Sequence, residues 1–297
     1  MWRGTTAVVH ARFDTAQAEL SNSENTPETG AIVERAYNSQ RRLLDTADID
    51  SMRTSELAAH YLALVLLGIP RAARAQRISD TPGTARAQKE RAVHTLSQFN
   101  YDLATALLYM SPQARGDIRN RLERLDRLLI AGTWHLDSLG KDLPRRITGA
   151  ECEVAAFTAL ETALPKQWEV KRATRAEDQS GIDIIVTDDA GVDLLLDVKS
   201  RTAFQEAVDT FEARTSRSSG VAQTVRKEGA LYQWRRGADG RQVLHCTFDA
   251  TSFGTINNCL YDDPTVLANF VVDSMPERAA HQVGQTPRRS LGRTALR

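Results

Sequence analysis

Cysteine is scarce in this chain: the 297 residues include only Cys152, Cys246 and Cys259, which stand far apart. None belongs to a CxxC pair, which argues against a zinc ribbon, and the spacing gives no disulfide framework. Scattered thiols of this kind are typical of proteins kept in a reducing compartment. We therefore expect a cytoplasmic protein.

Net charge is missing as well. The 38 Lys and Arg residues balance 38 Asp and Glu residues, so the formal net charge is zero. No overall field draws the protein toward nucleic acid, and any binding of phosphates has to rest on local basic segments. With 41% hydrophobic and 26% charged residues, the chain still has enough apolar side chains to bury a core.

Long apolar runs are also absent. The longest run covers residues 57–69, contains His60 and is too short to span a bilayer, so it predicts a buried helix. The first residues lead into no apolar region of the kind that signal peptides carry, and we expect no signal peptide. The sequence has no GxSxG, P-loop, GxGxxG or Cys/His dyad, which argues against the enzyme classes that depend on them.

The patterns that are present divide the chain into four parts. Residues 1–30 are rich in Ser, Thr, Asn and Glu and predict a flexible N-terminal segment. Residues 31–145 carry apolar side chains at helical spacing and predict a helical domain. Residues 146–275 alternate between helix and strand patterns, and residues 276–297 predict a flexible basic tail. The predicted fold class is therefore mixed α/β, with a helical N-terminal domain.

In the helical domain we predict helices over residues 31–44, 54–67 and 84–110, the second ending before Gly68 and Pro70. Ser111 and Pro112 are the residue types of an N-cap and a first helical position, so they predict the start of another helix. Arginines on one face of that helix either contact phosphates or form an ordinary solvated surface. They are Arg115, Arg119, Arg121, Arg124 and Arg127.

The pattern changes after Pro144. Thr148 and Glu151 have the spacing of a capping box and predict a helix that begins there and ends at Pro165. Further elements follow in the order strand, strand, strand, helix, hairpin and helix. They cover residues 168–172, 182–187, 192–199, 203–214, 230–236 with 241–248, and 265–275.

The second and third of these strands bring charged side chains together. Residues 188–191 predict a tight turn, which sets Asp183 opposite Leu196 or Asp197. Because side chains alternate along a strand, Asp197 and Lys199 point to the same face. Two carboxylates and one ammonium group are therefore expected within a few ångströms of each other.

This grouping suits the hydrolysis of phosphodiester bonds. The transition state carries extra negative charge, which a divalent cation held by carboxylates offsets while it activates a water molecule. Mg²⁺ or Mn²⁺ needs only one or two carboxylates besides water and phosphate oxygens. Lys199 is placed to orient the attacking water or to stabilise the phosphate charge.

Asp183, preceded by Gly181 and Ile182, and Asp197, followed two residues later by Lys199, resemble the D-x(n)-(D/E)-x-K signature of the restriction-endonuclease-like PD-(D/E)xK nuclease superfamily. Ile182 stands where the motif has its nominal proline.

The preceding helix, with Gly149 four residues before Glu153, is similar to the acidic helix of the archaeal Holliday-junction resolvase and Mrr-like branches. The resemblance covers residues 147–250. It implies an αβββαβ core, Asp183 and Asp197 as metal ligands, Lys199 as the catalytic lysine and Glu153 as an auxiliary acid. Glu151 competes for that last role, but its place in the predicted capping box favours Glu153.

Two functions remain open. One is a divalent-metal-dependent nuclease acting on nucleic acid, with DNA as the expected substrate and a homodimer formed through the helical domain. The other is a catalytically inactive assembly protein whose helical domain binds a partner. Tyr232 and Trp234 either stack on bases or belong to the core, and we expect His245 to be a packed residue. The sequence leaves DNA or RNA, and single or double strand, undecided.

Overall fold

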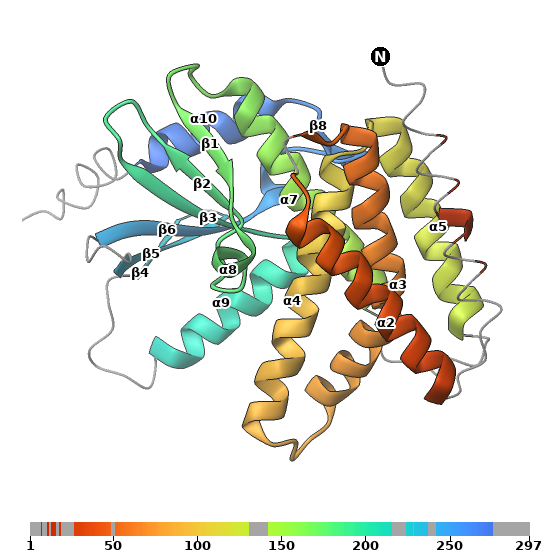
Figure 1. Cartoon of the computed structure of the whole chain (residues 1–297). Helices are drawn as coiled ribbons and strands as arrows, with labels where there is room; N and C mark the ends of the chain where they lie inside the picture. Colours follow the sequence, from red (N-terminus) through yellow and green to blue (C-terminus); the bar gives the residue numbers. More distant parts are fainter. Residues whose placement is uncertain are drawn as a thin grey trace, which may run out of the picture.

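The structure is a computed structural model that describes residues 27–48, 51–130, 142–215, 224–227, 229–236 and 242–275, with residues 7, 11, 13–15 and 18 before them. The predicted tail over residues 276–297 and most of the predicted N-terminal segment lie outside the described residues. So do residues 131–141 and 216–223. The described part is a mixed α/β protein, in which long helices stand beside a twisted sheet (Figure 1).

The N-terminal half of the described chain consists of long helices. They are α2 (Pro27–Thr46), α3 (Thr54–Asp80), α4 (Arg86–Leu108) and α5 (Pro112–Ile130). Helix α2 begins inside the segment that was predicted to be flexible, so that boundary was wrong by a few residues. The start of α5 is as predicted, because Ser111 Oγ accepts a hydrogen bond from the backbone N–H of Ala114 at 3.3 Å.

Helix α3 does not end where the sequence predicted. It continues through Gly68 and Pro70 to Asp80. A Cβ at Gly68 would lie 3.3 Å from the Tyr37 ring and 3.5 Å from the Phe99 ring, so the missing side chain lets α2 and α4 pack closely against α3. Pro70 removes one helical hydrogen bond, but the buried residues around it offset that loss.

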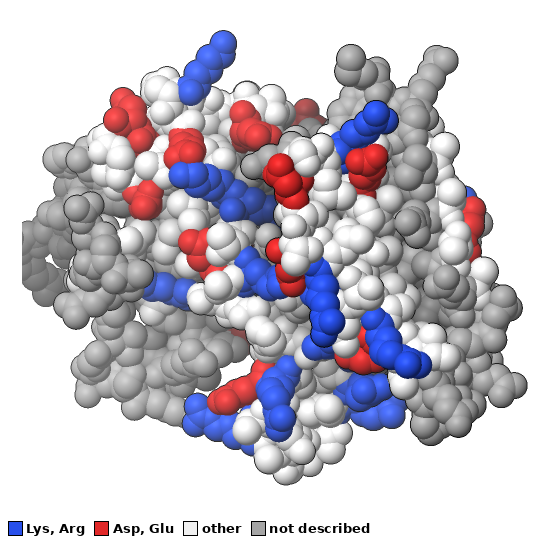
Figure 2. All heavy atoms as spheres, viewed as in Figure 1, with Lys and Arg blue, Asp and Glu red and all other residues white. Residues whose placement is uncertain are grey.

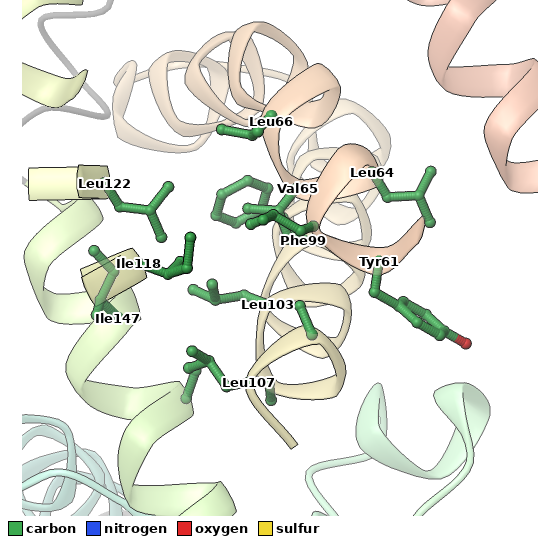
Figure 3. Packing of buried hydrophobic residues seen from close by; sticks show 14 of the residues in the cluster. Tyr61, Leu64, Val65, Leu66, Phe99, Leu103, Leu107, Ile118, Leu122 and Ile147 are labelled. Carbon is green, nitrogen blue, oxygen red and sulfur yellow. The ribbon is translucent and has the colours of Figure 1, made fainter. Parts of the chain in front are cut away.

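The helices enclose one hydrophobic cluster, to which α3 contributes most. Helix α3 has the length and composition of a membrane-crossing helix, yet most of its apolar window is buried inside the protein. Figure 3 shows its side chains meeting those of α4 and α5. The prediction of a buried helix at residues 57–69 is confirmed.

Helix α7 (Leu143–Ala163) joins the helical part to the sheet. Its residues Ile147 and Val154 belong to the helical cluster, whereas Cys152 and Leu160 belong to a second cluster against the sheet. The predicted capping box was wrong, because Thr148 lies inside this helix and donates its hydroxyl to the carbonyl of Pro144 at 3.0 Å. The helix begins earlier, with a proline in its first turn and with Leu143 and Ile147 buried in the helical cluster. The predicted domain boundary between residues 145 and 146 falls within α7 and stays a prediction.

The sheet has the strand order β1-β2-β3-β6-β5-β4 and is antiparallel except between β3 and β6. Its strands are β1 (Glu169–Arg172), β2 (Ile184–Thr187), β3 (Asp193–Lys199), β4 (Thr224–Lys227), β5 (Ala230–Arg236) and β6 (Gln242–Asp249). All but β4 were predicted, with ends within two residues.

Helices cover both faces of the sheet. Helices α7 and α10 (Pro264–Ser274) pack on one face, and α9 (Arg201–Thr215) packs on the other through Phe204 and Val208 (Figure 1). Tyr232 is buried and its hydroxyl lies 2.7 Å from Ser274 Oγ, while Trp234 packs at the edge of the same cluster. Both aromatic residues therefore belong to the core, which was one of the two interpretations.

The remaining short elements connect these layers. They are α8 (Arg175–Asp178), the 3₁₀ helix η2 (Ala250–Phe253) and a two-stranded ribbon of β7 (Ile256–Asn257) and β8 (Leu260–Tyr261). None of these was predicted from the sequence.

The tight packing at Gly68 gives a test of the helical core. We expect Gly68→Val to lower the free energy of unfolding by about 1–3 kcal/mol, because its methyl groups would overlap the Tyr37 and Phe99 rings. Gly149→Ala is the control: it also replaces a helical glycine, but nothing lies within 4 Å of the added Cβ. Urea unfolding of both variants measures the difference. Equal stabilities would contradict the packing described here.

Candidate metal centre

The β2–β3 hairpin places the predicted acids as the sequence suggested. Ile184 pairs with Leu196, and continuing this register by one residue sets Asp183 opposite Asp197. The backbone N–H of Asp183 donates to the carbonyl of Leu196 at 2.8 Å. Its carboxylate Oδ2 accepts a hydrogen bond of 2.6 Å from the backbone N–H of Val198. The Asp183 side chain is thus fixed across the hairpin beside β3.

Three acids from three different elements converge at this point. Glu153 comes from the middle of α7, Asp178 from the end of α8 and Asp183 from the residue before β2. One carboxylate oxygen of each lies within 4.8 Å of those of the other two. Glu153 and Asp183 are both only 8% exposed. We call these three residues the acidic triad; Glu153 and Asp183 were predicted site residues, and Asp178 was not.

The other two predicted site residues form a pair beside the triad. Lys199 Nζ makes an ion pair with Asp197 Oδ1, and Thr247 Oγ1 on β6 donates to Asp197 Oδ2 at 3.1 Å. Asp197 is therefore not one of the acids whose oxygens cluster in the triad, and its role as a metal ligand stays a prediction. Lys199 lines the same cavity as the triad.

Burial makes this concentration of carboxylates costly. It raises the pKa of Asp183 well above its usual range, and the neighbouring charges of Asp197 and Glu153 raise it further, against the opposing effect of Lys199. Burial also raises the pKa of Glu153 and of Asp178. For Lys199, burial would lower the pKa, but the nearby Asp197 and Asp183 carboxylates outweigh it and the pKa is raised.

The residues present fit a divalent cation. The triad supplies oxygen ligands, which Mg²⁺ and Mn²⁺ prefer. When all are ionised, the four carboxylates of the triad and Asp197 exceed the positive charges of Arg172 and Lys199 by two. A divalent cation would neutralise that excess and relieve the mutual repulsion of the carboxylates.

Helix α4 positions two members of the triad, Glu153 through Arg172 of β1 and Asp178 directly. The Arg172 guanidinium donates from Nε to Glu153 Oε1 at 2.9 Å and from Nη2 to the carbonyl of Tyr101 at 3.2 Å. The same group lies 4.4 Å from the centre of the Tyr101 ring and contacts Thr105 Oγ1. Ser97 Oγ donates to Asp178 Oδ2 at 2.7 Å. The helical part of the chain therefore orients the acids that the sheet part presents.

A cavity of about 530 Å³ opens onto the triad. Its walls come from α4, α7, the loop before β2 and the end of β3, so both parts of the chain enclose it. Lysine, arginine, aspartate and glutamate side chains are interspersed over the face of the molecule in Figure 2.

His245 contacts the backbone that precedes Asp183. It is 2% exposed, and its Nε2 lies 2.8 Å from the carbonyl oxygen of Gly181. Burial lowers the pKa of His245, so its ring is neutral at neutral pH. Gly181 has φ of +76°, a conformation that favours glycine, and it turns the chain from α8 toward Asp183. His245 is a packed residue, as predicted.

The arginines of α5 and the alternative acid Glu151 make contacts away from the triad. Arg115 is buried and donates to the carbonyls of Leu107 and Leu108 at the end of α4, so it is not a phosphate-binding surface residue. Arg119 pairs with Glu151 at 2.8 Å, which directs Glu151 toward α5 and away from the triad. The choice of Glu153 over Glu151 thus agrees with the geometry. The side chains of Arg124 and Arg127 lie outside the described part of the structure.

No family model, no curated protein and no solved structure matches this chain.

The buried pair of Arg172 and Glu153 gives a stability test. We expect Arg172→Met to lower the free energy of unfolding by about 3–5 kcal/mol, because it leaves a buried carboxylate without its ion-pair partner. Lys171→Met is the matched control on the same strand, since Lys171 pairs with Glu169 at the surface and its loss changes stability by only about 0.5 kcal/mol. A similar loss of unfolding free energy in the two variants would show that Arg172 does not stabilise the buried carboxylate of Glu153.

The hydrogen bond from Ser97 gives a test of metal binding. We expect Ser97→Ala to weaken Mn²⁺ binding at least about tenfold in calorimetry, because Asp178 loses the donor that orients it. Thr95→Ala is the control: its hydroxyl lies on the same helix but bonds to the backbone of Arg91. Unchanged affinity in Ser97→Ala would mean that Asp178 does not bind the cation or does not need this support.

Proposed function

We propose that the protein is a divalent-metal-dependent nuclease that hydrolyses phosphodiester bonds, with DNA as its substrate. The observation that carries the proposal is the acidic triad, whose oxygens lie within 4.8 Å of one another beside the ion pair of Lys199 and Asp197. Buried carboxylates gathered with a lysine on a strand end can hold a metal ion and stabilise the negative charge that develops in phosphodiester hydrolysis.

The order of elements supports the same proposal. Helix α7, strands β1, β2 and β3, helix α9 and then β6 follow the αβββαβ order that the resemblance to PD-(D/E)xK nucleases implies, with the short helix α8 inserted between β1 and β2, and β4 and β5 inserted before β6. Strand β6 lies parallel to β3, so the strand that carries Asp197 and Lys199 is central in the sheet. We infer a restriction-endonuclease-like core from this order together with the triad.

In this proposal Glu153, Asp178 and Asp183 hold Mg²⁺ or Mn²⁺. The bound cation supplies charge that offsets the developing negative charge of the phosphate and lowers the pKa of a bound water. Lys199 has a raised pKa and is charged at neutral pH, so it contributes positive charge near the phosphate instead of accepting a proton. Asp197 and Thr247 fix the position of this lysine.

The proposal is tested by cleavage of plasmid DNA and of single-stranded DNA in Mg²⁺ or Mn²⁺. We expect the wild-type protein to cut at least one of the two, and Asp183→Asn and Lys199→Ala each to lower the rate by at least about a hundredfold. Asp193→Asn is the matched control on β3, since Asp193 is exposed and accepts its bond from Thr187. Circular dichroism checks that each variant is folded.

A wild-type protein that cuts neither substrate, or activity that survives both Asp183→Asn and Lys199→Ala, would overturn the nuclease assignment. The first result would favour the alternative of a catalytically inactive assembly protein.

A further inference from the structure

One face of α4 lines the cavity at the candidate metal centre and extends from it toward the surface. Arg86, Lys89, Val93, Ser97 and Asn100 follow each other at intervals of three or four residues, so they lie along one side of the helix. Each of them lines a cavity, whereas the adjoining side of α4, with Ala92, Leu96 and Phe99, packs into the helical cluster.

Two cavities meet along this face. The first, of about 530 Å³, contains the acidic triad and reaches Val93 and Ser97. The second, of about 560 Å³, is lined by the same two residues and extends to Arg86 and Lys89 near the N-terminal end of α4. Both cavities are lined by Val93 and Ser97, so they adjoin at these residues, and we call the two together the α4 groove. It leads from the surface to the triad.

The size of the groove limits what can reach the triad. Each cavity has a volume typical of pockets for a single drug-sized molecule, about 300–1,000 Å³, which is the scale of a nucleotide. At the inner end, Glu153 and Asp183 are only 8% exposed and α4 stands directly beside them. Cavities of this scale suit one strand, taken nucleotide by nucleotide, better than a double helix.

The chemistry of the groove suits one strand of nucleic acid. Arg86 and Lys89 offer cationic groups for phosphates at the outer end, where the N-terminus of α4 adds its own positive potential. Val93 is 57% exposed and offers an apolar contact for a base or sugar. The pair of Arg86 with Glu90 is fully at the surface and therefore readily exchanged for a phosphate contact.

We propose that the α4 groove guides one unpaired strand of DNA to the triad, so that the protein acts on single strands or frayed ends and not on intact double helix. This inference rests on the proposed nuclease function, since it names the substrate form that the same site takes. It also gives the helical part of the chain a role in selecting the substrate.

The test measures binding of a fluorescent single-stranded DNA and of the matching duplex by anisotropy, using the full chain with Ca²⁺ in place of Mg²⁺. We expect the single strand to bind at least about tenfold more tightly than the duplex. Arg86→Glu should weaken single-strand binding and reduce the slope of log affinity against log salt by about 0.7, the effect of one lost phosphate contact. Val93→Trp, which fills the junction of the two cavities, should also weaken it while leaving Mn²⁺ affinity unchanged.

Arg91→Glu is the matched control. Arg91 is an exposed arginine on the same helix and lies about 140° around the axis from Arg86, outside both cavity linings. Equal affinity for single strand and duplex, or equal effects of Arg86→Glu and Arg91→Glu, would overturn the groove even if plasmid cleavage were observed. Single-strand binding that depends on Arg86 without any cleavage would support the groove and overturn the nuclease proposal.

Discussion

Helix α7 has to bury two of its faces at once, and the rest of the structure depends on that constraint. One face packs with the long helices through Ile147 and Val154, and the other packs against the sheet through Cys152 and Leu160. Glu153 lies at the boundary between these faces, where neither hydrophobic cluster covers it fully. A carboxylate in that position must find charged or polar partners, because leaving it buried and unpaired costs several kcal/mol.

The partners of Glu153 tie the two parts of the molecule into one site. Arg172 neutralises it from β1 and at the same time contacts Tyr101 and Thr105 on α4. Ser97 on the same helix holds Asp178. The acids therefore depend on a helix far from them in the chain, since Ser97 stands 81 residues before Asp178, and this gives the helical part a structural reason to stand beside the sheet. Because α4 also walls the cavity, the same packing that orients the acids restricts access to them.

Local patterns predicted the hairpin well and the triad only in part. The turn at residues 188–191 fixes the strand register, because strand pairing follows from turn length, and this register sets Asp183 opposite Asp197. Asp178 was missed because its four-residue helix has no periodicity to detect. The signal that could have found it is the pair Thr174 and Glu177, which forms a capping box at the start of α8. The same spacing at Thr148 and Glu151 wrongly predicted a capping box there. Only tertiary burial distinguishes the pattern at Thr148 from the one at Thr174. Burial also explains why α3 continues past Gly68, although the local sequence predicts that the helix ends there.

The most direct test of the central claim is anomalous diffraction from crystals of the full chain soaked in Mn²⁺. We expect an anomalous peak among the carboxylate oxygens of Glu153, Asp178 and Asp183, at coordination distance from at least two of them. Saturating Mn²⁺ with no peak at the triad, or with peaks only at other acidic groups, would contradict the claim that these three residues form a metal centre.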